Sequence, residues 1–330
     1  MPETLLMLIL VLAGVAVLLT GGEFLVRGAT ALARALGIPA LIVGLTIVAF
    51  GTSAPEMVVS AAAAIREAPG LAIGNIVGSN IANILLVLGL PAILVPMATA
   101  APGVKRNAAI ALALTGVFIY MGFDGALTLT EGWILAGLIV VYIVYLGVSA
   151  RSAKDDPVIA ELTDIDHMEG LPKGALAIGG YTLLGLILLP VGAELIVRGG
   201  VGIAELLGVP EAIIGLTILA LGTSLPELAT AMVAALRKQA EMAIGNVIGS
   251  NIFNICAVGG ITGIAATAAT GQPAPVDPEF IRLDFWVMAG AMVAASALVF
   301  AKKPVGRLVG AVFFATYVVY IGYLAWSALG

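Results

Sequence analysis

Two glutamates lie inside long apolar stretches, and each closes the same short phrase. GLTIVAFGTSAPE ends at Glu56, and GLTILALGTSLPE ends at Glu227, 171 residues later. A carboxylate near the centre of a bilayer costs several kcal/mol to bury, so such a residue usually has a partner or a task. We therefore take both glutamates as candidate functional residues.

A break in the helix is expected beside each glutamate. Pro55 and Pro226 have no N–H, and the ring of each clashes with the carbonyl four residues earlier. We expect carbonyl oxygens near Ala49 and Ala220 to lose their helical donors as a result. Four hydroxyl groups lie within one turn of the predicted breaks: Thr52, Ser53, Thr223 and Ser224.

A second phrase that is rich in polar side chains follows each glutamate. It reads GNIVGSNIAN up to Asn83 and GNVIGSNIFN up to Asn254. In each copy the serine and the last asparagine are four residues apart, so Ser79 lies on the face of Asn83 and Ser250 on that of Asn254. Two further asparagines stand one turn before the serines, and they are expected either to form hydrogen bonds between helices or to contact an ion: Asn75 and Asn246.

Together these motifs offer carboxylate, amide, hydroxyl and carbonyl oxygens, with neither an imidazole nor a thiol among them. Hard cations such as Ca²⁺ and Na⁺ prefer oxygen ligands, whereas Zn²⁺ and copper prefer nitrogen and sulfur. Two glutamates supply two negative charges, which balance one Ca²⁺ or two Na⁺. If the two kinds of ion compete for one pocket, the protein can couple their flows as an antiporter.

The composition determines the elements that must position these side chains. The chain of 330 residues is 61% hydrophobic and 11% charged, with a mean hydropathy of +1.14, while soluble domains have about 25% charged residues. A membrane-spanning helix needs about 20 mostly apolar residues. We predict an all-α membrane protein in the lipid bilayer, because a β-barrel would show short alternating segments.

Apolar runs between charges and Pro/Gly clusters predict ten transmembrane helices. They are 4–26, 39–65, 71–96, 105–123, 131–150, 174–199, 210–236, 241–268, 283–301 and 305–328.

The two motifs belong to a long internal repeat. With a constant offset of 171, ten of thirteen positions are identical between Ala72–Ile84 and Ala243–Ile255. We predict a first five-helix repeat in 1–150, a linker loop in 151–173 and a second five-helix repeat in 174–330. Because five is odd, the second copy enters the membrane from the opposite side, which gives inverted-topology repeats.

Basic residues predict the orientation. Twelve of the fifteen Lys and Arg lie in loops and helix ends after odd-numbered spans, and cytoplasmic loops carry the excess of positive charge. We therefore expect both termini outside and the central loop in the cytoplasm, in a multi-pass protein of a prokaryotic cell membrane. The loop contains His167 and several acids, but it lacks the pattern of an EF-hand loop, so we expect a linker.

The doubled motifs GTSAPE with GNIVGSNIAN and GTSLPE with GNVIGSNIFN resemble the α-repeats of the sodium/calcium exchanger branch of the cation/calcium antiporter superfamily. The resemblance covers essentially the whole chain. It implies a cation pocket in mid-membrane between the second, third, seventh and eighth spans, and sliding of the first and sixth spans across that bundle. It also implies a transporter without a cofactor, and we expect neither a nucleic-acid partner nor a need for a second copy.

The resemblance implies two overlapping sets of ligands. Ca²⁺ would be bound by Glu56, Glu227 and the carbonyls of Thr52 and Thr223. For Na⁺ it adds further oxygens, those of Ser53, Ser224, Ser79, Ser250, Asn83 and Asn254 and the carbonyls of Ala49 and Ala220. The family often has Asp where this sequence has Asn254, and the amide keeps the oxygen while removing a charge, which disfavours K⁺ co-transport.

Other functions stay open on the sequence. An H⁺/Ca²⁺ antiporter is the main alternative, although the proton-coupled branch carries GNAxE motifs instead. A cation channel is less favoured, because the predicted pseudo-twofold axis lies in the membrane plane. An enzyme is not expected, since the chain has no HExxH motif and no Ser–His or Cys–His arrangement. Two pairs spaced by four residues can form ion pairs near a membrane edge or act as snorkelling anchors there: Glu23 with Arg27, and Glu194 with Arg198.

Overall fold

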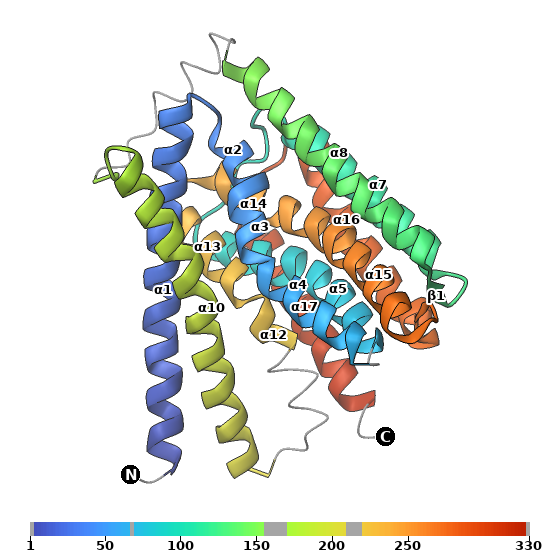
Figure 1. Ribbon diagram of the computed structural model, residues 1–330. Helices are drawn as coiled ribbons and strands as arrows, with labels where there is room; N and C mark the ends of the chain where they lie inside the picture. Colours follow the sequence, from blue (N-terminus) through green and yellow to red (C-terminus); the bar gives the residue numbers. More distant parts are fainter. Residues whose placement is uncertain (1–2, 67–68, 155–169, 209–219, 328–330) are drawn as a thin grey trace.

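The computed structural model describes residues 3–66, 69–154, 170–208 and 220–327. Among these residues, eight helices are long and apolar enough to cross a membrane, and a bent pair makes a ninth if it is one span. The protein is therefore an α-helical membrane protein (Figure 1). Five spans are unbroken α-helices: α1 (Glu3–Leu36), α7 (Val104–Gly122), α8 (Leu129–Lys154), α10 (Ala175–Leu206) and α17 (Arg307–Ser327).

The other helices are interrupted. Some contain a π-helical segment, namely α5 (Pro69–Ala82), η2 (Asn83–Leu88) and α6 (Gly89–Leu94), then α14 (Ala240–Phe253), η4 (Asn254–Val258) and α15 (Gly259–Thr270), and finally η5 (Phe280–Asp284) and α16 (Phe285–Phe300). Others bend or break, namely α2 (Ala40–Val43), η1 (Gly44–Val48), α3 (Ala49–Thr52) and α4 (Ala54–Ile65), with α12 (Ala220–Thr223) and α13 (Leu225–Leu236).

Helices lie at the predicted spans, but several ends differ from the prediction. α1 continues to Leu36 rather than residue 26, and α10 continues to Leu206 rather than residue 199. Charged residues do not end these helices, because each arginine pairs with the glutamate one turn earlier, at 2.5 Å in α1 and 2.6 Å in α10. α8 likewise extends to Lys154, four residues into the predicted loop. Residues 210–219 of the seventh predicted span, and His167, lie outside the described residues.

A short strand pair is the exception to the all-helical prediction. β1 (Ala126–Leu127) pairs antiparallel with β2 (Ala274–Pro275) and joins the α7–α8 loop to the α15–α16 loop. Strands of two residues are too short for alternating hydrophobicity to reveal them in a sequence.

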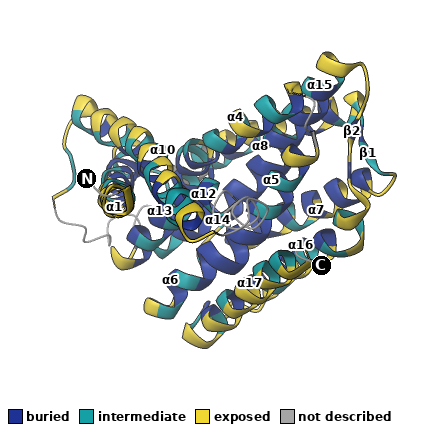
Figure 2. Cartoon of the chain, turned by 90° about the horizontal axis from the view of Figure 1, so that it is seen from below, coloured by how far each residue is buried: buried dark blue, intermediate teal, exposed yellow. Residues whose placement is uncertain are grey.

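The innermost layer of the fold is formed by α5 and α14. They belong to the spans Gly70–Leu94 and Ala240–Thr270, in whose most apolar windows 83% and 61% of the residues are buried, against 22% for α1 and 28% for α10. Figure 2 shows the same contrast, with α5 and α14 at the centre and exposed residues on α1, α10 and α17. Glycines let backbones approach closely here, since a Cβ at Gly245 would lie 2.7 Å from the carbonyl oxygen of Leu41.

α1 and α10 pack against each other as an antiparallel pair at one side of the molecule (Figure 1). Glycines recur every seven residues along their contact: Gly14, Gly21 and Gly28 on α1, and Gly185, Gly192 and Gly199 on α10. A Cβ at Gly192 would lie 2.6 Å from the backbone nitrogen of Leu18, and one at Gly185 would lie 2.5 Å from that of Leu25. The small residues therefore bring the two backbones into direct contact.

Candidate cation site

The predicted helix breaks are present beside both glutamates. α3 and α4 meet at Ser53, which has φ −84° and ψ 1°, and the helix pair bends there by 41°. Ser224, between α12 and α13, has nearly the same conformation, with φ −88° and ψ 0°. The same sequence thus produces the same local break in both copies of the motif.

The carbonyl of Ala49 itself keeps its donors. Its oxygen accepts the N–H of Ser53 at 3.0 Å and the hydroxyl of Thr52 at 3.4 Å. The carbonyl that loses its helical donor is that of Gly51, because Pro55, four residues later, has no N–H. Ala220 begins α12 directly after residues outside the description, and its side chain is outside it as well.

Both glutamates are buried in the interior, with exposed fractions of 1% for Glu56 and 0% for Glu227. The hydroxyl of Ser53 donates to Oε1 of Glu227 at 3.2 Å, so the first motif touches the carboxylate of the second. Neither carboxylate oxygen of Glu56 has a hydrogen-bond partner in the protein, and neither has Oε2 of Glu227. The two acids therefore belong to one site made by both motifs.

The serines and asparagines of the second phrase surround this site. α4, which carries Glu56, packs against η4, which begins at Asn254, and α13, which carries Glu227, packs against η2, which begins at Asn83. The side chains of the predicted residues are buried, and several of their polar atoms have no partner: the hydroxyls of Ser79 and Ser224, Oδ1 of Asn83, and both amide atoms of Asn254. Ser250 lies with its hydroxyl 3.5 Å from that of Thr52.

The threonines of the first phrase make the same contact twice in different surroundings. Thr52 donates to Oδ1 of Asn246 at 3.3 Å, and Thr223 donates to Oδ1 of Asn75 at 3.3 Å. These bonds join separate helices, which is one of the two roles expected for both asparagines. Thr52 and Asn246 are fully buried, whereas Thr223 and Asn75 are half-buried, so the site is less covered on the side of α12 and α5.

Three polar residues near the site were missed in the sequence, namely Ser60, Asn80 and Asn251, and the side chain of Asn80 bonds only within its own helix. Asn75 also donates to the hydroxyl of Ser60 at 2.9 Å, and Asn251 accepts a hydrogen bond from Asn83 at 3.0 Å. Asn80 bonds to the carbonyl of Ile76 in its own helix at 2.7 Å. The repeat of GSN in both copies was the available signal for the two asparagines.

The electrostatics of the cluster indicate a cation. Buried polar groups in proteins are nearly always hydrogen-bonded, and an ionised carboxylate without a partner costs still more to bury. Here unpartnered carboxylate, hydroxyl and amide atoms gather around two acids. No group of three or more His, Cys, Asp or Glu forms within the described ranges, so the donor set is two carboxylates with neutral oxygens. A cation would satisfy these oxygens and offset the negative charge.

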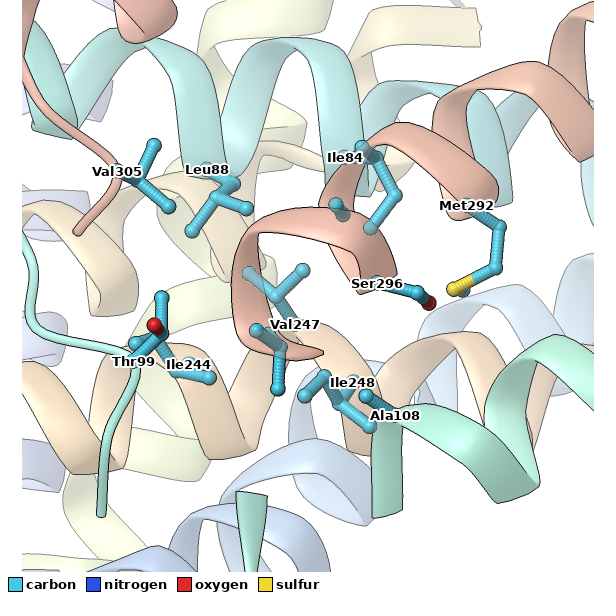
Figure 3. Close-up of a pocket in the computed structure, with 12 residues that line it drawn as sticks. Ile84, Leu88, Thr99, Ala108, Ile244, Val247, Ile248, Met292, Ser296 and Val305 are labelled. Atoms are coloured by element: carbon cyan, nitrogen blue, oxygen red, sulfur yellow. The ribbon is translucent and has the colours of Figure 1, made fainter. Parts of the chain in front are cut away.

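A separate small cavity of about 20 Å³ lies between η2, α14 and α16 (Figure 3). Its lining is mostly apolar, and neither Glu56 nor Glu227 contributes to it. Ser296 is among the lining residues, and its hydroxyl has no hydrogen-bond partner among the described residues. With room for about one water molecule, the cavity is a packing feature and not part of the cation site.

Comparisons with known proteins agree on one family. The family model described as sodium/calcium exchanger protein matches residues 6–149 and 178–326. The chain is 34% identical over 322 residues to the inner membrane protein YrbG of Escherichia coli, covering 96% of both chains. It is 35% identical over 287 residues to the sodium/calcium exchanger MaX1 of Methanosarcina acetivorans, covering 78% of this chain and 82% of the relative.

A solved structure is similar over nearly the whole chain. The sodium-calcium exchanger NCX_Mj, in crystals soaked with Na⁺ and Sr²⁺, superposes with a TM-score of 0.81 at 30% sequence identity. The match covers 97% of this chain and 98% of that chain. The arrangement of helices around the two acids therefore has a close counterpart among known folds.

Proposed function

The chain belongs to the sodium/calcium exchanger protein family, and on that premise we propose that it exchanges Na⁺ for Ca²⁺ at one shared site. The observation that carries this proposal is the buried pair of Glu56 and Glu227, with three of their four carboxylate oxygens lacking a partner in the protein. Two negative charges in an apolar interior need two positive charges nearby, and one Ca²⁺ or two Na⁺ would supply them.

The proposed Ca²⁺ ligands are the carboxylates of Glu56 and Glu227 and the carbonyls of Thr52 and Thr223. Four carboxylate oxygens and two carbonyls would give about six ligands, which is the lower end of the range that Ca²⁺ takes. The flexible geometry of Ca²⁺ coordination suits ligands that come from two separate helix breaks.

Na⁺ would use the same acids with additional neutral oxygens. The proposed additions are Ser53, Ser79, Ser224, Ser250, Asn83 and Asn254, with Ala49 and Ala220 through their carbonyls. The oxygen of Ala49 already accepts two hydrogen bonds, so it would have to give up one of them to bind Na⁺. Since both ions need Glu56 and Glu227, binding of one excludes the other, and this competition couples the two flows.

Alternating access would follow from the two-fold design of the chain. We propose ten spans in two inverted five-helix repeats, 1–150 and 174–330, with α1 and α10 sliding across the bundle that holds the acids. The half-buried state of Thr223 and Asn75, against the full burial of Thr52 and Asn246, supports access from the side of α12. By the distribution of basic residues, that side is the outside of the cell, and the central linker is cytoplasmic.

The test is Ca²⁺ uptake by the purified protein in liposomes with a preset Na⁺ gradient. We expect uptake of radioactive calcium that requires Na⁺ inside and stops when choline replaces it. Uptake that ignores Na⁺ and follows a pH gradient would instead support an H⁺/Ca²⁺ antiporter. Calcium flux with neither counter-ion would support a channel. If more than two positive charges enter per Ca²⁺, membrane voltage adds about 2.3 kcal/mol per net charge per 100 mV.

A further inference from the structure

The amide of Asn83 has a defined orientation in the site. Its Nδ2 donates to Oδ1 of Asn251 at 3.0 Å, while its own Oδ1 is buried and has no partner. Only the oxygen end of an amide can bind a cation, because the NH₂ end carries two donors. The torsion that turns an asparagine amide has broad, roughly two-fold preferences, so a neighbouring contact must determine which end meets an ion.

Asn251 is itself held by a second contact. Its Nδ2 lies 3.5 Å from the carbonyl oxygen of Asn80, and the side chain is 1% exposed. Because the NH₂ group of Asn251 is directed to this carbonyl, its Oδ1 is the end that faces Asn83. The two contacts form a short chain from the α5 backbone through Asn251 of α14 to the first residue of η2.

The equivalent residues of the other copy lack this chain. Asn80, at the position of Asn251 in the first copy, donates to the carbonyl of Ile76 in its own helix at 2.7 Å. Asn254, the counterpart of Asn83, has no partner at Nδ2 or Oδ1. Within the described structure, one of the two terminal asparagines is oriented by a neighbour and the other is not.

We propose that Asn251 is a positioning residue that presents the carbonyl oxygen of Asn83 to a bound Na⁺. This inference rests on the proposed function, in which Asn83 belongs to the Na⁺ ligands and not to the Ca²⁺ ligands. Loss of Asn251 lets the amide of Asn83 turn its NH₂ group towards the ion. Binding of Na⁺ is then weakened more than binding of Ca²⁺.

The experiment compares Asn251→Ala with Asn80→Ala, a matched control that keeps the Asn80 backbone carbonyl. Half-saturating concentrations of Na⁺ and Ca²⁺ are measured in liposomes for each purified variant. For Asn251→Ala we expect the Na⁺ value to rise about fivefold or more while the Ca²⁺ value stays within about twofold. For Asn80→Ala both values should stay within about twofold. Asn251→Leu, of similar volume and without polar atoms, replaces the alanine variant if that one does not fold.

A second background separates orientation from mere packing. In Asn83→Asp the side chain ends in two oxygens and no longer needs to be oriented, so adding Asn251→Ala should leave the Na⁺ value unchanged. An equal loss of Na⁺ and Ca²⁺ affinity in Asn251→Ala, or a loss that persists in the Asn83→Asp background, would overturn the proposal. If the unsubstituted protein shows no Na⁺-driven Ca²⁺ uptake, the proposed function fails instead.

Discussion

Arg237, directly after α13, binds both carboxylate oxygens of Glu23 in α1, although the residues are 214 positions apart. Glu23 also accepts a hydrogen bond from Arg27 at 2.5 Å. In the other copy the corresponding residues are Glu194, Arg198 and Arg66. There Glu194 pairs with Arg198 at 2.6 Å, and in the part of the chain that the structure describes it has no ion pair with Arg66. Among the described residues, the pair of α1 and α10 is therefore tied to the central bundle by an ion-pair network through Glu23 but not through Glu194.

Arg237→Gln is expected to shift the proposed access equilibrium towards the state in which the site opens to the cytoplasm. A half-exposed charge network of this kind contributes about 1 kcal/mol, which is about fivefold in an equilibrium constant. The equilibrium between the two access states can be followed with Thr52→Cys. The measurement is the rate at which the new thiol reacts with a polar thiol reagent added from the cytoplasmic side. We expect an increase of about fivefold.

Arg66→Gln is the matched control, because it removes the equivalent charge where no ion pair with Glu194 exists. It should leave the labelling rate within about twofold. A similar change in both variants would mean that the charge itself, and not its contact with Glu23, sets the equilibrium.

The uneven burial of the two threonines predicts uneven access to solvent. In a Cys256→Ser background, which removes the one native cysteine, Thr223→Cys should react with a polar thiol reagent added outside at least about tenfold faster than Thr52→Cys. The reason is that Thr223 and Asn75 are half-buried while Thr52 and Asn246 are fully buried. Equal rates in sealed vesicles of known orientation would contradict one-sided access.

Removal of either buried carboxylate should abolish exchange. In Glu56→Gln or Glu227→Gln, one carboxylate remains to balance the two positive charges of a bound Ca²⁺. The uncompensated charge should weaken Ca²⁺ binding by about 3–5 kcal/mol, which is at least about a hundredfold in affinity. Calcium uptake in liposomes should fall to background while the elution profile of the folded protein is retained. Glu194→Gln removes a carboxylate that is 56% exposed and should keep most of the activity. Normal exchange by either buried-site variant would refute the assigned site.

A methyl group in the contact between α1 and α10 should disturb both stability and transport. At Gly192 it would lie 2.6 Å from the backbone of Leu18, which cannot move aside as a side chain could. We expect Gly192→Ala to lower the free energy of unfolding by about 1–3 kcal/mol. The melting temperature should fall accordingly, and exchange should be slower. Gly180→Ala, on the same helix with no atom within 4 Å of the new methyl group, should be neutral or slightly stabilising. Equal melting temperatures for the two variants would show that the contact is not tight.

The sequence predicted much of this site because its chemistry is local. A proline followed by a glutamate in an apolar run determines both the break and the buried charge, and Ser53 and Ser224 indeed take nearly the same conformation. The spacing of four between serine and asparagine likewise follows from helix geometry alone.

What the sequence did not predict depends on contacts between distant residues. The end of α1 was placed too early, because hydropathy treats Arg27 as a charge and does not account for its pairing with Glu23 within the helix. The donors of the Ala49 carbonyl could not be assigned before the exact turn was known. Asn251 gains its importance only through Asn83 and Asn80, which lie on another helix.

The glycine contact between α1 and α10 also bears on how tightly the proposed Na⁺ and Ca²⁺ fluxes are coupled. Two helices whose backbones touch at seven-residue intervals move together as one rigid unit. In the proposed sliding movement, opening the site on one side of the membrane therefore closes it on the other. In the proposed mechanism, their movement then produces no state that is open to both sides of the membrane, so Na⁺ does not cross without Ca²⁺ moving the other way.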